Sequence, residues 1–189
     1  SVASAGDVNG DGYRDVIIGA YSFDDGFTDE GKAFVYHGSA TGLSATPNST
    51  PDDADQAGAN FGYCVASAGD VNGDGFDDFI ILGSHVVFGK ASGFSATMEL
   101  SSIDGSNGFN LNTDRAYSDS VSTAGDVNGD GFDDLIIGSR GSYYSNFPGT
   151  NYVIFGKASG FDMDANITSV DGKNGFRIDV NVFSWGGSP

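Results

Sequence analysis

The peptide Gly-Asp-Val-Asn-Gly-Asp-Gly, followed by an aromatic residue, occurs three times in this chain of 189 residues. The copies begin at Gly6, Gly69 and Gly125, and each continues through an aspartate into a run of apolar residues. Their first aspartates are 63 and 56 residues apart (70 − 7 and 126 − 70). A motif that returns at such intervals indicates a repeat architecture, in which similar units stack on one another. The sequence therefore predicts three repeats, approximately 1–60, 61–116 and 117–184.

Each copy places oxygen-bearing side chains at positions 1, 3, 5 and 9, counted from its first aspartate. Carboxylate and amide oxygens, without sulfur or imidazole, are the donors that a hard cation such as Ca²⁺ prefers. The backbone carbonyl at position 7 can add an oxygen, and the glycine at position 6 permits the sharp turn. We therefore expect about three Ca²⁺ per chain. The predicted ligands are Asp7, Asn9, Asp11, Tyr13 and Asp15, then Asp70, Asn72, Asp74, Phe76 and Asp78, then Asp126, Asn128, Asp130, Phe132 and Asp134.

The residues after each loop decide between a helical and a strand-based calcium motif. Helical motifs of the EF-hand and dockerin type need an acid at position 12, where this chain has Ile18, Ile81 and Ile137. The apolar runs are short and rich in β-branched or bulky residues, which favours buried strands. Each loop is therefore expected to join two strands, with the aspartate at position 9 closing the cation shell. The alternative is a metal-free turn rich in Asp and Asn, which three copies with every ligand position filled disfavour.

Four strands are expected in each repeat. The second and third are apolar on both faces, as expected when a sheet lies between neighbouring sheets in a β-propeller. The fourth is the weakest, and two segments compete for it in each of the later repeats. The expected first strands are Val2–Ala5, Gly62–Ala68 and Asp119–Ala124, the second Asp15–Ala20, Asp78–Leu82 and Asp134–Gly138, the third Ala33–His37, His85–Phe88 and Tyr152–Phe155, and the fourth near Ala96–Leu100 and Met163–Ser169 or, alternatively, Phe109–Leu111 and Phe176–Val180.

The loop pattern D-x-[DN]-x-D-G-x-x-D, followed by an apolar strand, resembles the FG-GAP repeat of the integrin α-subunit β-propeller. The Phe-Gly element is present as Phe61-Gly62 but is Tyr117-Ser118 before the third loop. The Gly-Ala-Pro element survives only in part, as in Gly19-Ala20, and the Phe-Gly-Lys-Ala-Ser-Gly-Phe spacers at 88–94 and 155–161 are similar to those of bacterial members. The resemblance implies an all-β fold, with blades of four antiparallel strands and a role in adhesion or recognition.

The two ends of the chain suggest how a ring of blades could close. Trp185-Gly186 aligns with Phe61-Gly62, and Val2–Asp7 aligns with Val65–Asp70, so residues 185–189 open a further repeat. Three blades do not easily close a ring, because propellers usually have four to eight. We therefore treat 1–189 as a single propeller segment. Its ring would be completed by a second, head-to-tail copy, which gives six blades, or by a longer parent chain.

Charge and composition exclude some classes of partner. The formal net charge is −18, and nothing basic is available to neutralise phosphate, which argues against nucleic-acid binding. No apolar run approaches membrane-spanning length, so we expect no membrane insertion. Cys64 is the only cysteine and cannot form a disulfide within the chain. The acidic balance and the calcium chemistry together suit an extracellular or cell-surface location.

Sequence features outside the calcium loops do not identify the protein or glycan that this chain would bind. The connections between the second and third strands vary most, at 21–32 and 139–151, and hairpin geometry places them opposite the calcium loops. Such loops are the usual site for a protein or glycan ligand. Tyr143, Tyr144 and Phe147 would suit a lectin-like alternative, although ordinary packing is the simpler interpretation.

Catalysis is not expected from this sequence. Three near-identical cation sites suit structural ions better than a catalytic centre, which is normally unique. His37 and His85, at equivalent places on third strands, have no nucleophile nearby in sequence. Asp52, Asp53 and Asp55 resemble a solvated linker, and a fourth cation site there is the alternative. The remaining alternative is an accessory domain of a secreted hydrolase or lyase, with catalysis elsewhere.

Overall fold

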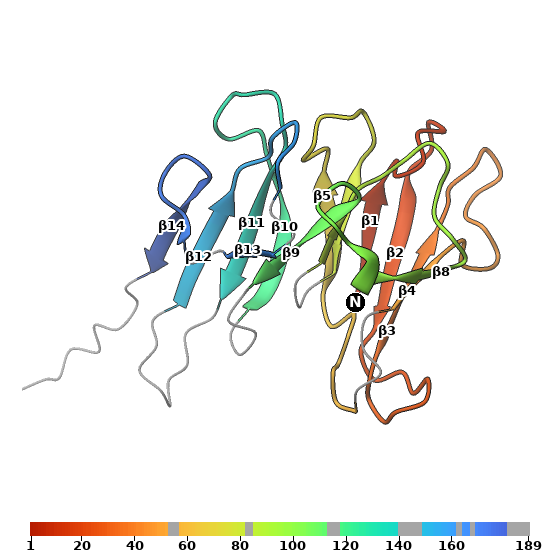
Figure 1. Cartoon of the computed structure of the whole chain (residues 1–189). Coiled ribbons are helices and arrows are strands. Elements are labelled where there is room, and N and C mark those ends of the chain that lie inside the picture. Colours follow the sequence, from red (N-terminus) through yellow and green to blue (C-terminus); the bar gives the residue numbers. More distant parts are fainter. Residues whose placement is uncertain are drawn as a thin grey trace, which may run out of the picture.

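The computed structural model describes residues 1–52, 57–81, 85–112, 118–139, 149–161, 164–166 and 169–180. Within these residues the fold is all-β, apart from short 3₁₀ segments such as η1 (Leu100–Ser102) (Figure 1). The strands are β1 (Val2–Gly6), β2 (Asp15–Ala20), β3 (Lys32–Tyr36), β4 (Thr50–Asp52), β5 (Val65–Gly69), β6 (Asp78–Ile81), β7 (His85–Val87), β8 (Thr97–Glu99), β9 (Gly108–Asn112), β10 (Ser118–Gly125), β11 (Asp134–Ser139), β12 (Gly149–Ile154), β13 (Asp164–Asn166) and β14 (Gly175–Val180).

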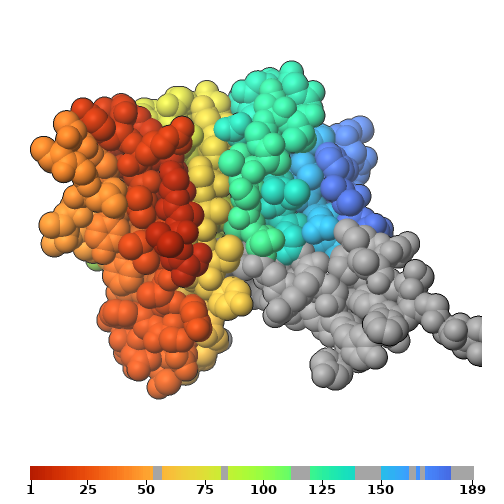
Figure 2. All heavy atoms as spheres, turned by 180° about the vertical axis from the view of Figure 1, so that it is seen from behind, coloured from red at the N-terminus to blue at the C-terminus, as the bar shows by residue number. Residues whose placement is uncertain are grey.

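Three sheets follow one another along the chain, and we call them the first, second and third blades. They contain the antiparallel series β1-β2-β3, β5-β6-β7-β9 and β10-β11-β12-β14. β5 lies beside both β1 and β10, so the first strands of the three blades are neighbours. Figure 2 shows the blades side by side in sequence order, from red through yellow and green to blue. This arrangement is that of consecutive β-propeller blades.

The fourth strands of the second and third blades are not Ala96–Leu100 and Met163–Ser169, the segments that the sequence favours. β9 and β14, the alternative segments, complete the second and third blades. The favoured segments form β8 and β13, which pair in parallel with β4 and β9 respectively. Each of these short strands therefore adds to an edge strand of the preceding repeat. Sequence pattern could not show this, because the pairing partner lies in another repeat.

Two hydrophobic cores fill the spaces between the blades. β6 of the second blade contributes to both cores, and all four of its residues are buried. Phe79 belongs to the core shared with the first blade, and its neighbour Ile80 belongs to the core shared with the third. Successive side chains of a strand point to opposite faces, so a strand buried on both faces must be apolar throughout. The prediction of a sheet sandwiched between two others is confirmed for the second blade.

Candidate cation-binding loops

The three acidic loops connect the first two strands of each blade, as the sequence predicted. They run from the end of β1 to β2, from β5 to β6 and from β10 to β11. The strand pairing shifts by one residue just before each loop, where Gly6, Gly69 and Gly125 face the aspartate at position 9. These glycines have φ values of 83°, 74° and 69°, a left-handed conformation that a side chain disfavours. The three loops therefore begin with the same backbone conformation.

Within each loop, the side chains at positions 1 and 3 accept hydrogen bonds from backbone N–H groups of the same loop. In the first loop Asp7 accepts hydrogen bonds from the N–H groups of Asp11 (3.0 Å) and Gly12 (2.8 Å). Asn9 accepts a further bond from the Asp11 N–H at 3.0 Å, and its amide donates to the Asp11 carboxylate at 3.1 Å. The same bonds recur in the second loop and in the third. The repeated sequence therefore specifies one loop conformation.

The aspartate at position 9 is fully buried in all three copies. In the second loop, Asp78 accepts hydrogen bonds from the backbone N–H groups of Val71 (2.9 Å) and Gly89 (2.8 Å). Val71 lies in the loop itself, whereas Gly89 follows β7, so this carboxylate fastens the loop to the end of the third strand. Asp15 and Asp134 make the equivalent bonds, to Val8 and Gly38 and to Val127 and Gly156.

Burial of these aspartates makes their ionised form costly. It raises the pKa of Asp78 to about 8, although the two backbone hydrogen bonds oppose this shift. The carboxylates of Asp74 and Asp70 raise the pKa further, because they repel a negative charge. Burial also raises the pKa values of Asp15 and Asp134. Each loop thus holds a buried carboxyl group whose ionised form a nearby cation would favour.

The donor chemistry of the loops fits a hard cation, because every side-chain ligand is a carboxylate or amide oxygen. Among the residues that the structure describes, no three Asp, Glu, His or Cys side chains gather closely enough to hold a metal ion. The oxygens at positions 1, 3 and 5 accept hydrogen bonds from loop N–H groups. Binding a cation would require these side chains to turn towards one point.

Comparison with known proteins bears on the identity of these repeats. A family model described as FG-GAP repeat matches residues 1–36 and 119–154, which contain β1–β3 and most of β10–β12. Integrin alpha-4 of Xenopus laevis is 28% identical over 144 residues, which are 71% of this chain and 14% of that protein. Human integrin alpha-7 is 33% identical over 81 residues, and integrin alpha pat-2 of Caenorhabditis briggsae is 41% identical over 86 residues. Each of these matches covers 43% of this chain, and 6% and 7% of the relative.

The first and third repeats thus match the FG-GAP repeat, and the chain is similar to integrin α subunits. The Phe-Gly element of the FG-GAP repeat has a visible structural role between the first two blades. Phe61 is buried and donates its backbone N–H to the Glu30 carbonyl at 2.8 Å. A side chain at Gly19 would overlap the backbone of Gly62, so glycine permits this close approach of two repeats.

The residue at position 8 of the FG-GAP loop contacts the loop of the preceding repeat, which the sequence analysis did not anticipate. Asp77 accepts a hydrogen bond from the Asp7 N–H at 2.7 Å, and Asp133 accepts one from the Asp70 N–H at 2.9 Å. The first loop has Arg14 at this position. The signal was therefore present in the sequence, because aspartate occupies position 8 in the two copies whose preceding loop lies within this sequence.

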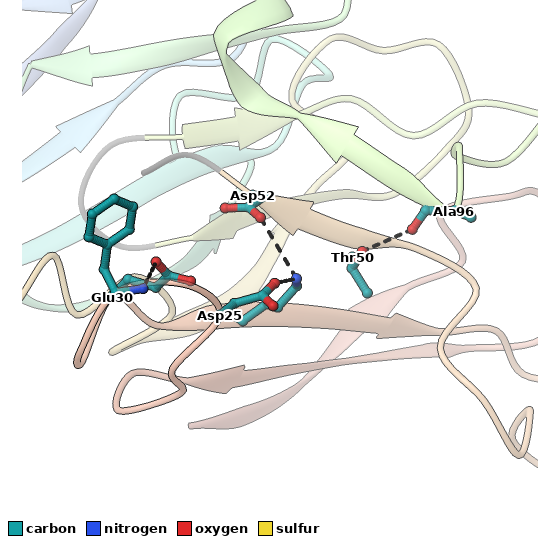
Figure 3. Close-up of polar contacts among 7 residues, drawn as sticks. Asp25, Glu30, Thr50, Asp52 and Ala96 are labelled. Atoms are coloured by element: carbon teal, nitrogen blue, oxygen red, sulfur yellow. Dashed lines mark hydrogen bonds and ion pairs between the residues drawn. The ribbon is translucent and has the colours of Figure 1, made fainter. Parts of the chain in front are cut away.

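The acidic connection between β2 and β3 uses its carboxylates internally (Figure 3). The Lys32 ammonium contacts the Asp25 carboxylate, and its nitrogen lies 3.7 Å from an oxygen of Asp52. Asp52 belongs to β4 and lies near the Lys32 ammonium, so its interpretation as part of a solvated linker is wrong. Asp53 and Asp55 lie outside the described residues. Buried Glu30 accepts a hydrogen bond from the Phe27 N–H at 3.0 Å.

The remaining candidate residues are only partly within the described ranges. His85 opens β7 and its ring nitrogen Nδ1 lies 2.8 Å from the Asn110 side-chain oxygen. The two histidines are not equivalent, because the strand pairing aligns His85 with Phe34, whereas His37 follows the end of β3. Tyr143, Tyr144 and Phe147, and the Trp185-Gly186 pair, lie outside the described residues.

Proposed function

We propose that this chain is a calcium-binding, integrin-like β-propeller segment that serves adhesion or recognition outside the cell and does not itself catalyse a reaction. The observation that carries the calcium part is the threefold occurrence of one loop with one hydrogen-bond pattern and a buried aspartate at position 9. Ca²⁺ would offset the negative charge of the three predicted aspartate ligands in each loop, and it accepts the oxygen ligands that the loop offers. About three Ca²⁺ per chain would reduce the net charge from −18 to −12.

Adhesion or recognition is supported by the relationship to integrin α subunits. The matches cover at most 14% of these relatives, so the role of a whole protein is part of the proposal. An extracellular setting is supported by the acidic balance and the calcium chemistry. No helix in the described part of the chain is long and apolar enough to cross a membrane. The lectin-like and accessory-domain alternatives gain no support from the described residues.

Calorimetric titration of metal-stripped protein with CaCl₂ tests the calcium part. We expect about three sites, with dissociation constants of about 10⁻⁴–10⁻³ M if they resemble other extracellular calcium modules. The matched control is the variant with Asp11→Asn, Asp74→Asn and Asp130→Asn, which removes one exposed carboxylate from each loop. It should bind distinctly more weakly. Absence of binding by the unaltered chain would contradict the proposal.

We also propose that the open face of the third blade binds a second copy of this chain. Ile136 and Phe176 on this face are 37% and 39% exposed, and Val127 in the adjoining loop is 51% exposed. At the equivalent positions of the second blade, Ile80, Phe109 and Val71 are at most 2% exposed, because the third blade covers them. Among the described residues, no further sheet covers the third blade.

The opposite face of the first blade is the complementary surface. Val2 is 70% exposed, whereas its equivalents Val65 and Val121 are 3% and 7% exposed, because each contacts the blade before it. The contact that occurs twice within the chain could therefore form a third time, between the third blade of one copy and the first blade of another. Two such contacts between two copies would close a ring of six blades.

Light scattering in millimolar calcium measures this association. We expect the mass of two chains for the unaltered protein and of one chain for Phe176→Asp, which places a charge within the proposed contact. Phe27→Asp is the matched control, because Phe27 is an exposed apolar residue in the connection between β2 and β3, which contacts the start of the second repeat, and it should leave the dimer intact. A single-chain mass for the unaltered protein, or a dimer of Phe176→Asp, would contradict the proposed contact.

A further inference from the structure

The first two cation loops are each held by the repeat that follows. Asp77 makes two hydrogen bonds to one residue of the preceding loop, because its carboxylate accepts from the Asp7 N–H at 2.7 Å and its own N–H donates to the Asp7 carbonyl at 3.1 Å. Asp133 makes the same pair of bonds to Asp70, at 2.9 and 3.1 Å. Both peptide groups that flank the position-1 ligand are therefore fixed by a residue from the next blade.

The next repeat also contacts the preceding loop at other points. A side chain at Gly6 would overlap Asp77, and one at Gly10 would overlap the ring of Phe76, so both glycines lie directly beneath these side chains. The backbone N–H of Lys90 donates to the Val8 carbonyl at 2.9 Å. Hydrogen bonds and packing from the second repeat thus restrain the backbone of the first loop over several residues.

The third loop has its conformation without a contact from a following repeat among the described residues. No heavy atom of the described residues lies within 4 Å of where a side chain would start at Gly125 or Gly129. Nevertheless, the third loop has the internal hydrogen bonds of the other two, and the φ values of Gly129 and Gly10 are 77° and 71°. The contact is therefore not needed to form the loop. Its remaining effect is to limit the movement of a loop that is already formed.

We propose that Asp77 and Asp133 are positioning residues for the cation site of the preceding repeat, so that calcium affinity at one loop depends on the next blade. This inference rests on the proposed calcium binding. A ligand whose backbone is already fixed loses less conformational entropy when it binds a cation. Hydrogen bonds that involve an ionised carboxylate are also stronger than neutral ones, so Asp77 is well suited to fix Asp7.

The chain provides an optical reporter for the first loop alone. Position 7 is Tyr13 in this loop, whereas it is Phe76 and Phe132 in the others. A tyrosine beside a bound terbium ion, Tb³⁺, transfers absorbed light to the ion, so Tyr13 should sensitise emission from Tb³⁺ in the first loop. The variant Tyr13→Phe identifies the part of the signal that comes from this loop. Calcium competition against Tb³⁺ then gives the calcium affinity of that site.

The experiment compares Asp77→Ala with Asp133→Ala in the full-length chain. We expect Asp77→Ala to weaken calcium binding at the first loop by roughly tenfold, because the loop backbone that Asp77 no longer fixes must be ordered when the ion binds. Asp133→Ala should leave this signal unchanged, because Asp133 contacts the second loop. Asp77→Asn retains an acceptor oxygen and should restore most of the affinity. When the reporter is moved to the second loop with Tyr13→Phe and Phe76→Tyr, Asp133→Ala should become the variant that weakens binding.

The outcomes separate this inference from the proposed function. If the unaltered chain binds neither Tb³⁺ nor calcium, the proposed calcium site fails. If it binds both and Asp77→Ala leaves the first-loop affinity unchanged, the positioning role is wrong although calcium binding stands. Equal losses in Asp77→Ala and Asp133→Ala would indicate general destabilisation and would also overturn the inference.

Discussion

Stripping calcium from this chain is expected to lower its melting temperature by on the order of 20 °C. A ligand present at about 100 times its dissociation constant stabilises the folded state by roughly 2.7 kcal/mol per site, so three sites would contribute about 8 kcal/mol. For a chain of this size, each kcal/mol shifts the midpoint by about 2–4 °C. Without the ions, each loop still has three predicted aspartate ligands within nine residues of sequence, in a chain whose net charge is already −18.

Differential scanning calorimetry in chelator and in calcium at about 100 times the dissociation constant, which is about 10–100 mM for the affinities expected above, measures this difference. The control is the variant with Asp11→Asn, Asp74→Asn and Asp130→Asn, whose melting temperature should respond much less to calcium. Magnesium at equal ionic strength separates specific binding from screening of the negative charge. An equal midpoint in both buffers, with metal analysis showing that the ions were removed, would contradict the proposed stabilisation.

The parts of the fold that the sequence predicted are those specified by local pattern. The loop residues lie between two strands because the runs that follow, such as Val16-Ile17-Ile18, are apolar, short and β-branched. β2 has its predicted bounds, and β6 and β11 begin at their predicted residues. These features depend on neighbours in sequence, so a single chain contains the necessary information.

The features that sequence analysis missed depend on contacts between repeats. β8 and β13 are short strands whose pairing partners, β4 and β9, belong to the preceding repeat. The role of Asp77 is of the same kind, because it contacts Asp7, which is 70 residues away in the chain. Comparing equivalent positions is informative even so, since Arg14 at position 8 of the first loop predicts that this position is not a cation ligand of its own loop.

The aspartate at position 9 is expected to have two separable roles, and replacing it should have the largest effect of any single loop substitution. Asp78 is fully buried, and its oxygens accept the backbone N–H groups of Val71 and Gly89. Asp78→Ala would leave both donors without this partner, at about 1–3 kcal/mol each. We therefore expect this variant to lose roughly 2–6 kcal/mol of stability even in chelator, in addition to its loss of calcium binding at the second loop.

Asp74→Ala is the matched comparison within the same loop. Asp74 is exposed, and among the described residues its carboxylate accepts hydrogen bonds only from the Phe76 N–H and the Asn72 amide. Its removal should weaken calcium binding while leaving stability in chelator nearly unchanged, because water can satisfy exposed groups. Urea unfolding in chelator, with calcium titration of each variant, distinguishes the two roles. If Asp78→Ala were as stable as Asp74→Ala in chelator, the buried hydrogen bonds would not fasten the loop. If Asp78→Ala kept the calcium affinity of the unaltered chain, position 9 would not close the cation shell.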